Sequence, residues 1–135
     1  MIVYVLFLVW SNFDYGRKGA SMPQAREFSI RITNGWPHFV MRARLGDRHG
    51  RLVGELTARC MSSPAKVLLG KIIAAKEYRE ELQALLFNRF EQAMRLGKRN
   101  LILTECVREQ RTFFESVGFR ILANSHGGYQ MEKQL

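Results

Sequence analysis

The sequence predicts an α+β domain in which helices pack on one mixed, mostly antiparallel central sheet, and three observations lead to this prediction. Polar and apolar residues alternate through much of residues 27–60, which is the period of half-buried strands. Residues 66–74 (KVLLGKIIA) are apolar on both faces, which is typical of a central strand. From Tyr78 onwards the apolar residues recur every three or four positions, which is helical spacing. Strands followed by alternating strands and helices indicate a layered α+β or α/β architecture.

The N-terminal residues 1–10 (MIVYVLFLVW) predict a buried strand, because they are rich in β-branched and aromatic side chains. The run is shorter than the about 20 apolar residues of a membrane-spanning helix, so we expect no membrane span. It also lacks the basic start and the A-x-A site of a signal peptide. The polar residues 11–24 predict a linker. We therefore expect residues 1–24 to be an extension or added strand plus linker, and residues 25–135 to be the main domain; alternatively, Met22 is the natural start.

The antiparallel part is expected to consist of three strands joined by short turns. The strands are predicted at residues 27–33, 38–45 and 51–60. Asn34-Gly35 and residues 46–50 (GDRHG) are turn signals between them. Ser62-Ser63-Pro64 then breaks the chain before the central strand.

Two amphipathic helices are predicted in the C-terminal half. The first spans residues 78–96 and is capped by Gly97. Its apolar stripe is formed by Leu82, Leu85, Leu86, Phe90, Ala93 and Met94. A buried strand is expected at residues 100–104, the second helix at 108–117, and closing strands at 119–122 and 129–132.

Composition and charge narrow the class of protein. The 135 residues fit one domain, and 47% hydrophobic with 24% charged residues is typical of a globular core. The formal net charge of +9 favours polyanionic partners such as nucleic acid; a solvated basic surface is the alternative. Cys60 and Cys106 predict buried thiols of a cytoplasmic protein, with one disulfide as the alternative. The sequence contains no cluster of histidines and cysteines that would indicate a metal site.

Two motifs of the C-terminal half resemble the GCN5-related N-acetyltransferase (GNAT) family. In residues 68–97 (LLGKIIAAKEYREELQALLFNRFEQAMRLG), a strand precedes a long helix, as it does in GNAT proteins. The family's loop between them has the form Arg/Gln-x-x-Gly-x-Gly/Ala, and residues 79–84 occupy those positions. The segment RTFFESVGF (residues 111–119) resembles the family's Phe-Tyr-x-x-x-Gly-Phe. The resemblance implies a GNAT-like fold over residues 66–135, whereas the N-terminal half matches only as antiparallel strands.

The resemblance also implies acetyl-CoA as cofactor and an amine as acceptor, on a small molecule, a protein N-terminus or a lysine. A helix N-terminus suits a pyrophosphate because it presents unpaired N–H groups and partial positive charge. The positions implied to bind acetyl-CoA are Ile73 and Ala74 along the pantetheine, Arg79, Leu82, Gln83 and Ala84 at the pyrophosphate, and Phe114 where the acid tyrosine usually lies. Glu55 and Glu105 are candidate general bases, because they lie near the expected cleft, and Tyr129 is a candidate acid. For the two glutamates the alternative is an ordinary, partly solvated carboxylate, and for Phe114 it is a core aromatic. Tyr129 would act as the acid only if the last hairpin folds over the cleft.

Several residues depart from the family pattern. Leu82 replaces the central loop glycine and is expected to crowd the phosphates, while Glu80 and Glu81 would repel them. Phe114 cannot donate a proton. Val107 and Gln110 stand where the family often has asparagine and alanine. Only residues 34–37 occupy the region where GNAT proteins usually place two acceptor-shaping helices.

These departures leave three hypotheses open. The chain is an N-acetyltransferase for an unknown amine, a GNAT-like binding module without catalysis, or a nucleic-acid-binding component built on this fold. A partner chain would supply the missing acceptor side, and a homodimer paired through residues 1–10 is one form of that hypothesis.

Overall fold

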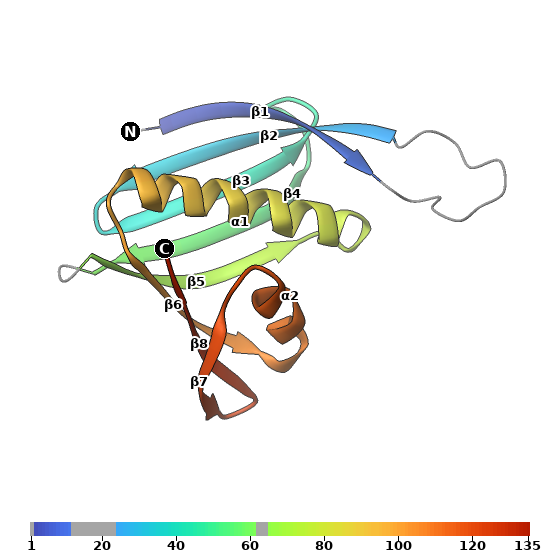
Figure 1. The fold of residues 1–135 in the computed structure, drawn as a ribbon. Helices are drawn as coiled ribbons and strands as arrows, with labels where there is room; N and C mark the ends of the chain where they lie inside the picture. The colour runs from blue at the N-terminus through green and yellow to red at the C-terminus, as the bar shows by residue number, and fades with distance from the viewer. Residues whose placement is uncertain (1, 12–23, 62–64) are drawn as a thin grey trace, which may run out of the picture.

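A computed structural model gives the fold of the chain and describes residues 2–11, 24–61 and 65–135 (Figure 1). The strands are β1 (Ile2–Ser11), β2 (Gln24–Gly35), β3 (His38–Leu45), β4 (Leu52–Cys60), β5 (Lys66–Ala74), β6 (Leu101–Val107), β7 (Arg120–Ser125) and β8 (Gly128–Gln134). The helices are α1 (Arg79–Leu96) and α2 (Arg111–Ser116), each preceded by a 3-10 turn, at Lys76–Tyr78 and Arg108–Gln110. The strands form one sheet in the order β1-β2-β3-β4-β5-β6-β8-β7.

The architecture confirms the predicted fold class. All neighbouring strands are antiparallel except β5 and β6, which are parallel, so the sheet is mixed and mostly antiparallel. The central strand has its predicted bounds, and α1 begins one residue later than expected. The second helix is shorter than predicted, because its first turn is 3-10 and α2 ends at Ser116. None of the described helices is long and apolar enough to cross a membrane.

Strand β1 lies at one edge of the sheet, where it pairs with β2 of its own chain from Ile2↔Thr33 to Ser11↔Gln24. The predicted N-terminal strand therefore has an intramolecular partner along one edge. The expected linker, including Met22-Pro23, and the chain break at Ser62-Ser63-Pro64 fall largely outside the described residues.

The core lies between α1 and one face of the sheet. Most of the predicted apolar stripe of α1 is buried there, whereas its Leu85 and Ala93 are only partly buried and Phe87, which was not predicted, is buried. The buried residues of α1 are Leu82, Leu86, Phe87, Phe90 and Met94. Phe90 meets Phe39 of β3 with ring centroids 5.6 Å apart, and Gly54 of β4 lies directly beneath Leu82. Phe87 contacts Phe113 of α2 at 6.3 Å, so α2 lies on the same side of the sheet as α1.

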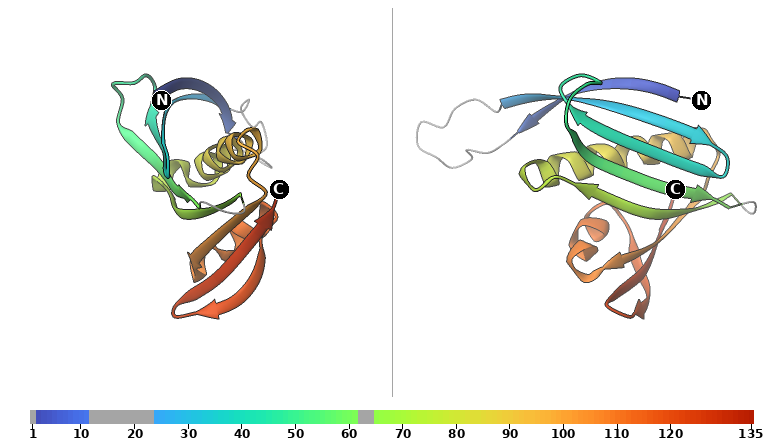
Figure 2. Two further views of the ribbon diagram at one scale, coloured as in Figure 1. Left: turned by 90° about the vertical axis from the view of Figure 1, so that its left-hand side faces the viewer. Right: turned by 180° about the vertical axis from the view of Figure 1, so that it is seen from behind.

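The opposite face of β2–β5 has no helix over it among the described residues, as the view from behind shows (Figure 2). Strand β5 has apolar residues on both faces, as expected, but only one of the two faces is buried. Val67 and Leu69 are buried, whereas Leu68 and Ile73 on the other face are 40% and 50% exposed. The helix-free face is therefore open to solvent at the centre of the sheet.

Candidate active site

The parallel strands β5 and β6 separate at their C-terminal ends. Their pairing runs from Lys66↔Leu101 to Leu69↔Thr104 and stops there, although β5 continues to Ala74 and β6 to Val107. The Thr104 hydroxyl donates to the Leu69 carbonyl at 3.1 Å at the last pair. Figure 1 shows the two strands diverging beyond this point. We call the diverging residues 70–74 and 105–107 the splay.

Backbone groups of β5 face into the splay. In an antiparallel ladder, alternate residues direct both N–H and C=O towards the same neighbouring strand. The Ala75 N–H donates to the Val53 carbonyl of β4 at 2.7 Å, so residue 75 faces β4. Ala74 and Ile72 consequently face the splay, and Ile73 faces β4. Of the two residues predicted to pair with pantetheine, Ala74 has the required backbone orientation and Ile73 does not.

Gln110 bridges the splay. Its Nε2 donates to the Ile72 carbonyl at 3.1 Å, across 38 positions of sequence. The residue belongs to the 3-10 turn between β6 and α2, so its side chain links the two diverging strands. The sequence shows a glutamine where GNAT proteins often have alanine, but its partner could be found only in the tertiary structure.

The N-terminus of α1 lies at the same end of β5, because one residue and a single 3-10 turn connect them. Arg79 is the first residue of α1 and is exposed. Gln83 and Ala84 lie further along the helix, where the i→i−4 pattern pairs their N–H groups with α1 carbonyls. The N–H groups available to a phosphate therefore belong to earlier residues than Gln83 and Ala84.

The expected crowding by Leu82 is not found, and this corrects the sequence-based expectation. Leu82 is fully buried, and its Cδ2 would lie 2.9 Å from a Cβ built on Gly54. Its side chain therefore faces the sheet and not the helix end. Glu80 is exposed in the first turn and remains a source of repulsion, whereas the side chains of Lys76 and Arg79 add positive charge at the same end.

Known structures share this arrangement of strands and helices. No protein-family model and no curated protein sequence matches the chain. Among solved structures, the PaiA N-acetyltransferase of Thermoplasma acidophilum in complex with coenzyme A matches with a TM-score of 0.64 and 16% identity, over 73% of this chain and 62% of that chain. Tetrahymena GCN5 matches with a TM-score of 0.59 and 17% identity, over 73% of this chain and 68% of that chain. The chain has the GNAT fold.

A third match leads to the same conclusion. The IAA acetyltransferase of Bacillus cereus has a TM-score of 0.61 and 12% identity, over 73% of this chain and 79% of that chain. At these identities the likeness is one of fold, and this chain spans less than two thirds of the PaiA protein's length. The likeness accordingly covers the splay and the start of α1 as parts of the fold.

Glu55, the first candidate base of this GNAT fold, is held by two cations. On β4, opposite Ile73, its Oε1 lies 2.7 Å from Lys71 Nζ and its Oε2 accepts from Arg42 Nε at 2.8 Å. The hydrogen bond from Lys71 and then that from Arg42 lower the pKa of Glu55 below its usual value of 4.5. A carboxylate with a lowered pKa is a weaker base, so the pairing reduces its fitness to deprotonate an ammonium.

This pairing makes a pH-dependent contribution to stability. We expect Glu55→Gln to lower the free energy of unfolding by about 1 kcal/mol at neutral pH, since Arg42 and Lys71 are half exposed and solvent screens the pair. A lowered folded pKa gives stability that is full above pH 4.5 and is lost as the pH falls through the folded value. Urea unfolding of both proteins at neutral pH and at steps below 4.5 checks this. A difference that grows in acid would contradict it.

The other two catalytic candidates lie on opposite faces of the sheet. Leu103 is in register with the exposed Leu68, so Glu105, two residues on, faces the helix-free side together with Glu55. Glu105 is exposed, and Gln130 Nε2 lies 3.4 Å from its Oε1. Tyr129 pairs with the buried Cys106 and therefore faces the helix side, where its hydroxyl accepts from Arg111 Nη1 at 3.3 Å. The structure brings the two glutamates to one face and leaves Tyr129 on the other.

Phe114 lies within an aromatic cluster of the core. Its ring centroid is 5.3 Å from that of Phe113 and 5.0 Å from that of Phe119, and its side chain is buried. Gly118, with a φ of +101°, turns the chain between these rings, which accounts for the glycine of the FFESVGF motif. Phe114 thus packs α2 against Phe119, which precedes β7, and carries no group that transfers a proton.

Proposed function

We propose that this protein is an acetyl-CoA-dependent N-acetyltransferase acting on an amine of a small molecule, a protein N-terminus or a lysine. One observation carries the proposal. The parallel β5–β6 pair stops at Leu69↔Thr104, and the Ala74 backbone faces the splay beside the N-terminus of α1. A strand-like pantetheine arm followed by phosphates fits a free strand edge that leads to a helix N-terminus.

In this proposal, residues of β5 bind the pantetheine arm and residues at the start of α1 bind the phosphates. The Ala74 N–H and C=O are placed to pair with an extended amide chain, as a neighbouring strand would. Lys76 and Arg79 add positive charge where phosphates would lie. When bound, acetyl-CoA supplies the thioester carbonyl carbon that the amine attacks, so a C–N bond forms and the C–S bond breaks.

Glu105 is the better placed general base of the two glutamates, because Glu55 is already engaged by Lys71 and Arg42. It would take the proton that the acceptor ammonium loses before attack. The leaving thiolate then needs a proton donor other than Phe114. Tyr129 lies on the far face, so a solvent proton is the simpler source.

A binding module without catalysis is the second candidate, and the Gln110 bridge favours it. Gln110 already donates to the Ile72 carbonyl, which is one of the groups facing the splay. The phenylalanine at position 114 also favours the binding module, because it cannot donate a proton as a tyrosine would. Such a protein would retain the fold and lose turnover.

Two measurements separate these candidates. Calorimetric titration with acetyl-CoA tests cofactor binding, and release of the CoA thiol in the presence of an amine panel tests turnover. Binding with turnover supports the acetyltransferase. Binding without turnover selects the module, and no heat at millimolar acetyl-CoA overturns cofactor binding.

Gln110→Ala is expected to bind acetyl-CoA up to about tenfold more tightly than the wild type. The substitution removes a donor that competes for the Ile72 carbonyl, and one such hydrogen bond contributes about 0.5–1.5 kcal/mol. Calorimetry gives the two dissociation constants. Gln92→Ala, an exposed position on α1, is the control and should change nothing. Weaker binding by Gln110→Ala would instead assign Gln110 to the cofactor site as a ligand.

A further inference from the structure

Positive charge concentrates in the part of the chain that forms the open sheet. Residues 27–74 contain eight arginines and lysines but only Glu27, Asp47 and Glu55 as acids. Residues 75–135 hold ten basic and eight acidic residues, so their charges nearly cancel. The middle of the chain therefore carries more than half of the net charge of +9.

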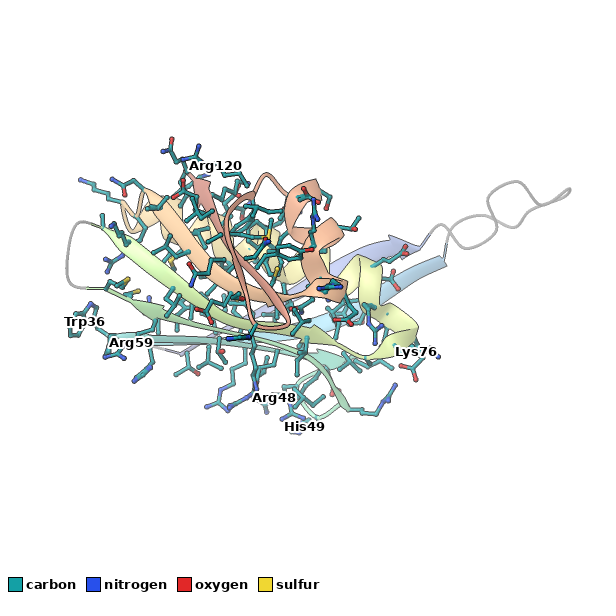
Figure 3. All side chains as sticks on the ribbon, turned by 90° about the horizontal axis from the view of Figure 1, so that it is seen from below. Trp36, Arg48, His49, Arg59, Lys76 and Arg120 are labelled. Atoms are coloured by element: carbon teal, nitrogen blue, oxygen red, sulfur yellow. The ribbon has the colours of Figure 1, made fainter. Side chains whose placement is uncertain are left out.

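The strand register places most of this charge on one surface. Residues whose neighbours in sequence are buried under α1 must face the opposite side, since side chains alternate along a strand. We call the helix-free side of β2–β5 the basic face. Its basic residues are Arg31, Arg42, Arg44, Arg59, Lys66 and Lys71. In Figure 3, Arg59 and Arg48 extend from the side of the sheet away from α2 and Arg120.

Cations outnumber acids on the basic face. Glu55 compensates Arg42 and Lys71 together, and the other acid of this face among the described strand residues is the exposed Glu27. A polyanion would supply the negative charge that balances this excess of cations.

Apolar side chains lie among these cations. Leu68 is directly opposite Arg59 on the neighbouring strand, and Ile73 is opposite Glu55. Trp36, in the turn between β2 and β3, is 67% exposed near the same end as Arg59 (Figure 3). A surface that mixes arginine with exposed apolar and aromatic groups suits unstacked bases joined by phosphates. In a duplex the bases are stacked and paired, so the apolar groups of this surface would find no base face to contact.

We propose that the basic face binds single-stranded nucleic acid through its phosphate backbone. Arginine dominates the face, and its planar guanidinium forms paired hydrogen bonds with phosphate and stacks on bases. Among the large hydrophobic side chains of the described residues, Trp36 is the one strongly exposed aromatic, and it lies in the turn at the end of this face, so stacking is limited and binding has little sequence preference. The inference does not rest on acetyl-CoA binding, since it uses the strands and not the splay.

Fluorescence anisotropy with labelled oligo(dT) and oligo(U) of about 16 nucleotides tests the proposal, a length at the upper end of single-strand site sizes. With four phosphates contacted, log Kobs should fall with log salt with a slope near −3, at about −0.7 per phosphate. A slope near zero would overturn the proposal. Equal or tighter binding of a duplex of the same length, or of polyglutamate, would overturn the choice of single-stranded nucleic acid.

A matched pair of variants locates the site. Arg44→Gln/Arg59→Gln should make the salt slope shallower by about 1.4, for two lost phosphate contacts, and weaken binding at low salt. Arg95→Gln/Lys98→Gln removes the same charge at the exposed C-terminal end of α1 and should leave the slope unchanged. Equal losses of affinity and salt slope in both variants would show that net charge alone drives binding, and would refute binding at the basic face. Thermal melts establish that both variants are folded.

Discussion

Phe90→Ala is expected to lower the free energy of unfolding by about 3–5 kcal/mol, which is the cost of emptying a well-packed aromatic site. Phe90 is fully buried on α1, and its ring meets Phe39 of β3 at 5.6 Å and Phe87 at 6.1 Å. Alanine would leave a cavity between the helix and the sheet that neither rigid element can close. Small domains are stable by about 5–15 kcal/mol, so the variant would be partly unfolded near body temperature.

Urea unfolding followed by circular dichroism measures this loss, with the slope m used to check two-state behaviour. Leu96→Ala is the matched control, since Leu96 ends the same helix but is 86% exposed. We expect its effect to stay within about 0.5 kcal/mol. Similar losses at both positions would show that α1 does not pack as described.

Gly54→Val is expected to cost about 1–3 kcal/mol by overpacking and to weaken acetyl-CoA binding as well. A Cβ at Gly54 would lie 2.9 Å from Leu82 Cδ2, 3.2 Å from Leu86 Cδ1 and 3.3 Å from the Ile73 carbonyl oxygen. The carbonyl belongs to the β4–β5 ladder, and the side chains of Leu82 and Leu86 are buried between α1 and the sheet, so we expect relief of the overlap to push α1 outwards. The shift would displace the start of α1 from the end of β5, where the proposed phosphate site lies.

Unfolding and calorimetric titration of the same variant separate the two effects. Gly35→Val is the control, because a Cβ there meets nothing within 4 Å. Combining Gly54→Val with Leu82→Ala should recover part of the stability lost by the two single changes, as a coupling of residues in contact requires. Additive losses would argue against the close approach of α1 to β4.

The sequence predicted the elements because each is encoded in local periodicity. The apolar stripe of α1, the bounds of β5 and the FFESVGF segment all depend on residues within one or two turns of each other. The GNAT fold that the resemblance implied is confirmed by the solved structures, and the helix that follows β5 lies where the motif in residues 68–97 placed it.

The site was less predictable because its geometry depends on faces and on long-range contacts. The replacement of a motif glycine by Leu82 suggested a blocked phosphate site, yet helix phase turns this side chain towards Gly54. Glu55, Glu105 and Tyr129 could be named as candidates from the sequence, but strand register decides that Tyr129 lies on the other face.

By itself, the sequence determined the succession of strands and helices and most of the buried stripe of α1, because these follow from short-range patterns of polarity, while its two motifs carried the resemblance to GNAT proteins. Only the tertiary structure decided that Gln110 reaches the Ile72 carbonyl and that the cations of β2–β5 share one uncovered face. Both features join residues from different strands, and pairing between distant strands is set by the packing of the whole sheet.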